Sequence, residues 1–254
     1  MNPTLRHRDV PDSPLARWDA RWKLAALLIA AFLTAALTSL AASLGMLLLA
    51  FLLLVVARLP RRWVRTRLTL FAVPALPFLL VLPFTLHGGL EWEIGPVRVS
   101  ESGLLAGTAV FARCLAVGCF SLVLLGTARF SDTLAAAHKL KVPGVLVLLT
   151  GLAYRYAFLL ADELRRIRVA LRTRGFRHRA NNHSYRTFGY AIGAVLVRGA
   201  DRADRVAAAM RCRGFDGTFR NTCKFETTTA DIISFVALTA SAVALLLWDR
   251  LVLA

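Results

Sequence analysis

Two copies of an arginine- and glycine-containing heptapeptide are the residues best suited to bind a partner. Residues 170–176 have the sequence ALRTRGF and residues 209–215 have AMRCRGF, with five of seven positions identical at an offset of 39. We call them the first and second Arg-Gly motifs. An arginine held at a rigid helix end can bind a carboxylate through two parallel hydrogen bonds. The repeat therefore predicts two docking points, and a partner that presents the same acidic groove twice.

The same residues also suit the end of a helix. Arginine favours the negative end of the helix dipole, and glycine just after the last turn tolerates the left-handed backbone that closes the helix. Helix capping explains a single copy about as well as docking does. Two near-identical copies, each at the end of a predicted amphipathic helix, favour docking.

Composition places the chain in a membrane. Of its 254 residues, 57% are hydrophobic, and the apolar residues come in long uncharged blocks. The net charge of +17 is compatible with nucleic acid, anionic lipid, an acidic partner or the excess of positive charge in cytosolic loops. We favour the last explanation and expect no nucleic acid partner, because no recognised nucleic-acid-binding module is present.

The block pattern predicts an all-α integral membrane protein with about five transmembrane helices. Residues 1–128 hold four spans at about 22–39, 41–57, 68–86 and 104–127, with a loop over 87–103. The first two come from one uncharged block, residues 24–57, which would be about 51 Å long as a single helix and is therefore split into a hairpin. Residues 129–230 form a cytosolic or interfacial coupling region, and residues 231–254 hold the last span.

Residues 143–161 are apolar enough to span the membrane, but charge argues against it. If they do not cross, 29 of the 32 Lys and Arg residues lie on the cytosolic side. This arrangement puts the N-terminus in the cytosol. Three helices are then expected in the coupling region, at about 131–142, 143–174 and 185–213, with Pro143 ending the first and Gly175 and Gly214 ending the others. Asp162 and Glu163 can pair with Arg166.

The chain lacks the residues that would drive transport by itself. It has no glycine-rich phosphate-binding loop of the GxxxxGK[ST] type, and apart from Arg113 the interiors of the proposed spans show no carboxylate or histidine that could carry ions or protons. We therefore expect no catalytic or metal-binding residues and no bound cofactor. The histidines (His7, His87, His138, His178 and His183) and the cysteines (Cys114, Cys119, Cys212 and Cys223) show no ligand spacing. A self-contained permease or channel and a membrane enzyme remain as alternatives.

Several further motifs stand beside the two Arg-Gly motifs, the second of which extends as RGFDG at 213–217. They are DARWK at 19–23, Arg113, LKVP at 140–143, Arg155-Tyr156 and Glu163. Together these motifs resemble those of the transmembrane T component of energy-coupling factor (ECF) transporters, most closely the cobalt/nickel type called CbiQ. Thr173 and Cys212 stand where alanine is common. The extended second motif is similar to the cobalt/nickel branch, and the resemblance does not separate cobalt from nickel.

The resemblance implies a non-catalytic subunit of an inner-membrane importer. Such a subunit couples two cytosolic ABC-type ATPases, which hold the ATP, to a separate membrane subunit that binds the substrate. It also implies that one arginine of each motif enters an acidic groove of an ATPase. By position the docking residues are Arg174, Gly175, Arg213 and Gly214, supported by Arg172, Arg211, Phe176, Phe215 and Asp216. Arg113, Arg155 and Glu163 are expected to be structural or coupling residues.

Overall fold

The computed structural model describes residues 13–85, 91–94, 97–177, 179, 181–217 and 227–253. The chain divides into two compact units. We call residues 1–136 and 223–254 the bundle, and residues 137–222 the helix pair.

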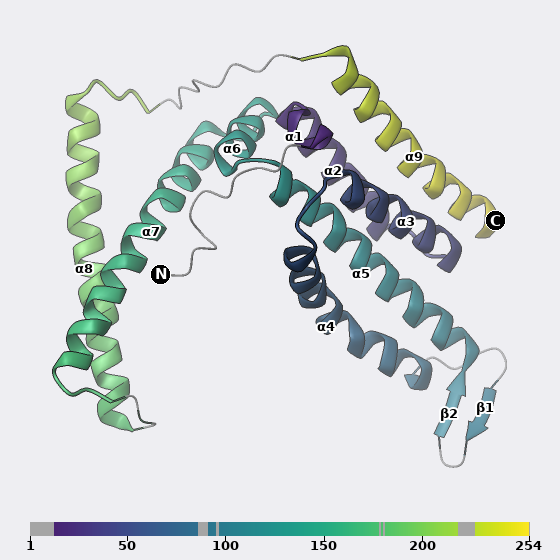
Figure 1. Ribbon diagram of the computed structural model, residues 1–254, viewed down its shortest axis with the longest axis horizontal. Helices are drawn as coiled ribbons and strands as arrows, with labels where there is room; N and C mark the ends of the chain where they lie inside the picture. The colour runs from purple at the N-terminus through teal and green to yellow at the C-terminus, as the bar shows by residue number, and fades with distance from the viewer. Residues whose placement is uncertain are drawn as a thin grey trace. The chain divides into compact units, whose positions relative to one another are not determined.

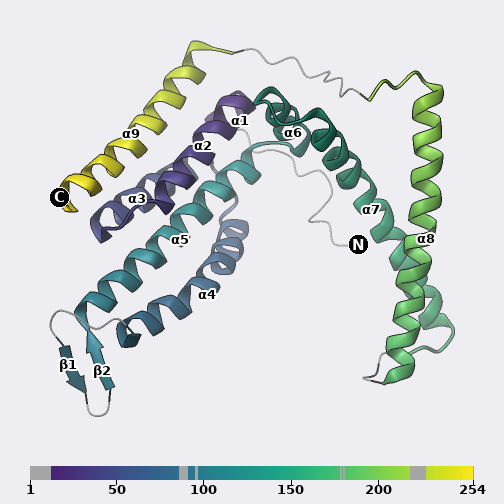
Figure 2. The ribbon, with the colours of Figure 1, turned by 180° about the vertical axis from the view of Figure 1, so that it is seen from behind.

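The described part of the bundle consists of helices and one small hairpin of strands (Figure 1). Its helices are α1 (Pro14–Arg17), α2 (Ala20–Ala35), α3 (Leu40–Val56), α4 (Arg61–Thr85), α5 (Glu101–Thr127) and α9 (Thr229–Leu253), and α6 (Phe130–Lys139) follows α5. Helix α5 packs against α2, α3 and α4, while α9 packs against α2 and α3, as both ribbon views show (Figures 1 and 2).

Small residues bring these helices close together. Gly103 and Gly107 of α5 lie one helical turn apart and face α4, and a Cβ atom on Gly103 would stand 2.6 Å from the carbonyl oxygen of Leu82. This spacing of small residues lets helix backbones approach in a membrane, where the hydrophobic effect does not drive helices together. Helix α4 stays continuous through Pro74, Pro77 and Pro83.

The outer surface of the bundle is apolar. Phe32, Leu48, Val73 and Leu251 are each between 67% and 78% exposed, which suits contact with lipid chains. Helices α4, α5 and α9 are long and apolar enough to cross a membrane, α3 is apolar but shorter, and α2 has 16 residues. The predicted spans coincide with α2, α3, α4, α5 and α9, although α4 begins seven residues before its predicted span.

The predicted loop at 87–103 is partly wrong. It contains two antiparallel strands, β1 (Glu91–Ile94) and β2 (Val97–Ser100), with Glu91 opposite Ser100. The sequence EWEI followed by VRVS alternates apolar and polar residues, which is typical of paired strands. The helical prediction therefore needs this one addition.

The helix pair consists of α7 (Gly144–Thr173) and α8 (Asn182–Cys212). The predicted ranges agree to within three residues, with α8 starting earlier at Asn182. The two helices run antiparallel (Figure 1), with Leu160 of α7 beside Gly199 of α8 and Glu163 of α7 beside Arg198 of α8. Helix α7 also meets the length and composition of a membrane span. That it does not cross rests on the distribution of Lys and Arg and stays a prediction.

Candidate docking site

Both Arg-Gly motifs form the same helix cap. In the first, the Phe176 N–H donates to the Leu171 carbonyl at 3.0 Å and the Gly175 N–H donates to the Arg172 carbonyl at 3.0 Å. In the second, the corresponding bonds run from Phe215 to Met210 at 3.1 Å and from Gly214 to Arg211 at 3.0 Å. The two glycines have φ of +80° and +74°. These are the paired bonds of a Schellman motif, which satisfies the last carbonyls of a helix.

Helix capping explains the glycine and the apolar residues of each motif, but it does not explain the arginines. The cap requires glycine in the left-handed position and favours an apolar residue on each side of it, which Leu171 and Phe176 supply in the first motif. Phe176 and Phe215 are half-buried, as this role requires. Any basic residue would complement the helix dipole. The identical placement of two arginines in each motif is therefore not explained by capping.

The arginines of both motifs point into solvent. Arg172, Arg174, Arg211 and Arg213 are all exposed, and none forms a hydrogen bond or ion pair with a side chain among the residues that the structure describes. Their guanidinium groups are thus available to a partner. Asp216, which follows the second motif, is also exposed.

The two motifs lie at opposite ends of the helix pair. Glu163 of α7 pairs with Arg198 of α8, so these two positions lie side by side in the antiparallel helices. Arg174 lies 11 residues after Glu163, and Arg213 lies 15 residues after Arg198, in the opposite direction. At about 1.5 Å per helical residue, the docking arginines are up to about 39 Å apart. Such a separation suits two distinct grooves better than one.

The pairing of Glu163 corrects one expectation. Arg166 was predicted as its partner on the same helix, but the structure brings Glu163 to Arg198, 35 residues away in the sequence. Glu163 therefore joins α7 to α8. Arg155 is exposed on α7 and forms no side-chain contact of this kind within the described residues.

Replacing Gly175 by alanine should separate the cap from the charge. Alanine at φ +80° is strained, so we expect Gly175→Ala to destabilise the end of α7 by about 1 kcal/mol. Gly189→Ala is the matched control, because Gly189 lies inside α8 with open space around it and without positive φ. Thermal melts of helicity in detergent should show a lower midpoint for Gly175→Ala only. Equal midpoints for both variants would contradict the cap.

Arg113 lies within the bundle and contacts backbone. Its Nη1 donates to the Leu37 carbonyl at 2.6 Å and its Nε donates to the Ala109 carbonyl at 3.2 Å. Leu37 follows the end of α2, where the helix dipole is negative, so the guanidinium complements the end of that helix. Arg113 also lines a cavity of about 490 Å³ with apolar neighbours such as Phe71 and Phe78.

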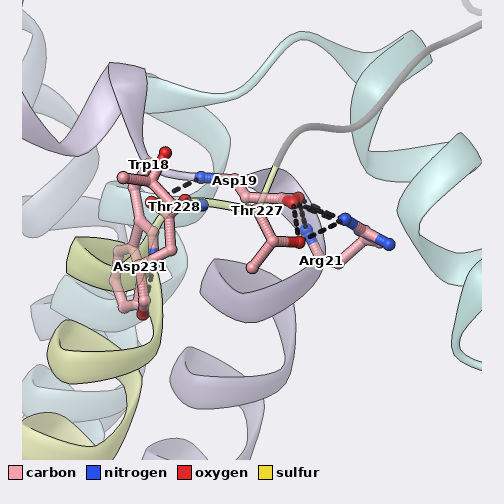
Figure 3. Close-up of polar contacts among 6 residues, drawn as sticks. All are labelled: Trp18, Asp19, Arg21, Thr227, Thr228 and Asp231. Carbon is pink, nitrogen blue, oxygen red and sulfur yellow. Dashed lines mark hydrogen bonds and ion pairs between the residues drawn. The ribbon is translucent and has the colours of Figure 1, made fainter.

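A second polar cluster joins the two ends of the chain within the bundle (Figure 3). The Trp18 indole N–H donates to the Asp231 carbonyl at 3.2 Å, and the Asp19 N–H donates to the Asp231 carboxylate at 3.3 Å. Arg21 forms an ion pair with Asp19 at 2.7 Å and donates to the Thr227 hydroxyl at 2.8 Å. These bonds fasten the start of α9 to the start of α2.

The Asp19–Arg21 ion pair stabilises the fold at neutral pH, where the Asp19 carboxyl is ionised. Burial raises the pKa of the Asp19 carboxyl, but hydrogen bonds from the side chain and backbone of Arg21 outweigh that effect and lower it. A carboxyl with a lowered pKa stabilises the fold above its ordinary pKa, and this contribution is lost as pH falls.

The sequence analysis did not predict a role for two buried charged residues, Lys23 and Asp249. Lys23 is 1% exposed, and its Nζ donates to the carbonyls of Leu15 at 2.9 Å and Thr127 at 3.1 Å, which ties α1 and α2 to the end of α5. Asp249 is fully buried near the end of α9. It accepts three bonds from the α2–α3 turn, from the Thr38 N–H and Ser39 N–H at 2.8 Å and from the Thr38 hydroxyl at 3.0 Å.

The signal for these residues was weak. Lys23 lies in the DARWK motif, which carried no role in the sequence, and Asp249 lies between Trp248 and Arg250 at an apparent helix end. Among the described residues, no three His, Cys, Asp or Glu side chains are grouped as metal ligands. His7, His87, His178 and Cys223 lie outside the described residues.

Comparison with known proteins agrees with the motifs. The CbiQ family, described as cobalt transport protein, matches residues 11–224. The chain is 30% identical over 130 residues to the cobalt transport protein CbiQ of Rhodobacter capsulatus, covering 50% of this chain and 53% of that protein. It is 29% identical over 145 residues to the energy-coupling factor transporter transmembrane protein EcfT of Streptococcus thermophilus, covering 53% and 55%.

An uncharacterised protein of Methanocaldococcus jannaschii is 26% identical over 154 residues, covering 61% of this chain and 53% of that protein. The chain thus spans about half the length of these relatives. The family match is much broader, since it extends over most of the 254 residues and includes both Arg-Gly motifs. The chain therefore belongs to the CbiQ family of cobalt transport proteins.

Proposed function

We propose that this chain is the energy-coupling transmembrane subunit of an ECF-type ABC importer for cobalt or nickel ions. It transmits the motion of two cytosolic ATPases to a separate membrane subunit that binds the substrate. The observation that carries the proposal is the pair of identical helix caps, each of which presents two exposed arginines without a carboxylate partner among the described residues.

The caps suit this task because they combine charge with rigidity. A Schellman cap fixes the backbone around the arginine, so little freedom is lost when the guanidinium enters an acidic groove. Two caps at opposite ends of one helix pair connect two ATPases through a single rigid lever. ATP would be bound by the ATPases, and this chain would hold no cofactor.

The alternative of a self-contained permease is disfavoured by the chemistry of the buried charges. An ion-driven carrier needs charged or polar groups that can change partners along a path through the membrane. In the described part of the bundle, Lys23, Arg113 and Asp249 are instead committed to backbone groups of neighbouring helices. Their arrangement favours a stable scaffold over a translocation path.

The metal assignment rests on likeness. The family is described as cobalt transport protein, and the Rhodobacter capsulatus relative bears the same name. In the proposed assembly the metal ion is cargo of the substrate-binding subunit. We place the chain in the inner membrane as a multi-pass protein, with the N-terminus and the helix pair on the cytosolic side.

Single charge reversals test the docking role. The chain is co-expressed with the ATPase subunits of its transporter and purified through a tag on the chain. Arg174→Glu and Arg213→Glu should each lower the amount of retained ATPase at least about tenfold, because a charge-assisted bond is lost and repulsion is added. Arg205→Glu, an equal charge change at an exposed site on α8, should retain the wild-type amount. Wild-type retention by both motif variants would show that the repeat serves capping alone.

A further inference from the structure

A second concentration of arginine lies in the bundle, at residues 58–67. Five of the ten residues from 58 to 67 are arginines, and all five are exposed: Arg58, Arg61, Arg62, Arg65 and Arg67. None of them forms an ion pair or hydrogen bond through its side chain with any residue that the structure describes. The docking function proposed above makes no use of them.

The patch is mounted firmly on the bundle. Ala57 and Leu59 are buried, and Leu59 packs so closely on Gly126 of α5 that a Cβ atom there would stand 2.7 Å from it. Trp63 is half-buried against the core, and the Arg67 guanidinium lies 5.8 Å from the centre of its ring. Tryptophan is typical of the membrane–water interface. These contacts therefore hold the arginines at a defined depth relative to the membrane.

The length of the uncharged part of α4 indicates the depth at which the arginines lie. From Leu68 to Thr85, α4 has 18 residues without charge, about 27 Å of helix, against a hydrocarbon core of about 30 Å. Arg61 to Arg67 add about 9 Å at one end, close to the thickness of a headgroup layer. When the apolar part of α4 spans the core, these arginines lie among the headgroups.

The side of α4 on which the arginines lie indicates that their binding partner is a lipid. At about 100° per residue, Arg61, Arg62 and Arg65 lie on one side of α4. The same side continues as Val73, Leu76 and Leu80, which are 67%, 49% and 59% exposed. A surface that faces lipid chains along the membrane faces lipid headgroups at its end. Exposed arginines there can bind phosphate oxygens through paired hydrogen bonds.

We propose that residues 58–67 form a binding site for anionic phospholipids of the cytosolic leaflet. Arg61, Arg62 and Arg65 hold the phosphate groups on this lipid-facing side, and Trp63 sets their depth. Arg67 lies over the Trp63 ring on another side of α4 and adds positive charge at the same level. Because the net charge of the lipid provides the attraction, phosphatidylglycerol should bind and phosphatidylcholine, with the same phosphate but no net charge, should bind weakly. The site fixes the level of α4 in the membrane.

Native mass spectrometry of the purified full chain tests the site. The chain in detergent is titrated with phosphatidylglycerol or with phosphatidylcholine of the same acyl chains, and bound lipids are counted. Each arginine should contribute about fivefold to the affinity for the anionic lipid. The quadruple variant Arg61→Gln, Arg62→Gln, Arg65→Gln and Arg67→Gln should therefore lose more than about a hundredfold, with phosphatidylcholine unchanged.

Two further variants guard the conclusion. A quadruple Arg→Lys variant at the same positions keeps the charge and should retain most of the binding, so loss in the Gln variant through misfolding would be recognised. The charge-matched control replaces Arg165, Arg168, Arg202 and Arg205 by Gln and should bind like wild type. Unchanged binding by the α4 Gln variant, or equal loss in the control, would overturn the proposal. The proposal would also be overturned if the α4 Gln variant bound lipid normally but no longer retained the ATPases, because residues 58–67 would then be a protein-docking surface.

Discussion

The double variant Arg174→Glu/Arg213→Glu should retain no detectable ATPase, whereas each single variant keeps a measurable fraction. Each motif contributes a charge-assisted pair worth about 1.5–3 kcal/mol, and the motifs are far enough apart for their effects to add. The combined loss should exceed about a hundredfold in affinity. Retention is measured by the amount of ATPase that co-purifies with the tagged chain.

Two double variants serve as controls for that result. Arg202→Glu/Arg205→Glu makes the same change in net charge on exposed positions of α8 and should bind like wild type. Arg174→Lys/Arg213→Lys keeps the charge but removes the planar fork of arginine, so binding should be intermediate. If the charge-matched control lost the ATPases as fully as the motif variant, general electrostatic attraction would explain the binding, and the motifs would have no special role.

Asp249→Ala should cause the largest loss of stability in the bundle. The carboxylate accepts three hydrogen bonds from Thr38 and Ser39, at the turn from α2 to α3, and it is fully buried. Its removal leaves three donors without their acceptor at a partly buried turn, where Thr38 is exposed and Ser39 is half-buried. We expect a loss of about 3 kcal/mol in the free energy of unfolding, measured by SDS titration of the purified chain.

The neighbouring residue supplies the control. Arg250 is exposed, and Arg250→Ala should change the free energy of unfolding by less than about 0.5 kcal/mol. Asp249→Asn retains one side-chain oxygen as acceptor and should fall between the two. Wild-type stability in Asp249→Ala would mean that the turn does not depend on this carboxylate.

The sequence predicted the parts of the structure that depend on local pattern. Long uncharged blocks gave the bundle helices, and the amphipathic stripes gave α7 and α8 to within three residues. The glycines of the Arg-Gly motifs predicted the helix ends, because only a left-handed residue closes a helix in this way. The candidate docking residues could be named for the same reason, although their binding is still a prediction.

Contacts between distant residues could not be predicted in this way. Asp249 meets the turn at Ser39 across 210 residues of sequence, and Asp231 meets Asp19 across 212. A carboxylate at a helix end has many possible partners in the sequence, since nothing local selects one. The same holds for Glu163, whose partner Arg198 lies on the other helix while Arg166 was close in sequence.

Polar contacts of buried charged residues join the helices of the bundle to one another. Helix α9 is fastened to α2 near its first turn through Asp231 and near its other end through Asp249. Lys23 fastens α2 to the end of α5. A bundle fixed in this way can resist force as one body. That property suits a scaffold against which an ATP-driven lever works, as the proposed function requires.

ATP-driven uptake by the reconstituted transporter tests the central claim most directly. Proteoliposomes containing the chain, the ATPases and the substrate-binding subunit are given radioactive cobalt, with and without ATP inside the ATPase-facing compartment. We predict that wild type and Arg202→Glu/Arg205→Glu accumulate cobalt only with ATP, and that Arg174→Glu/Arg213→Glu does not accumulate it. Uptake by the motif variant at the wild-type rate, or uptake by this chain without the ATPases, would contradict the coupling role.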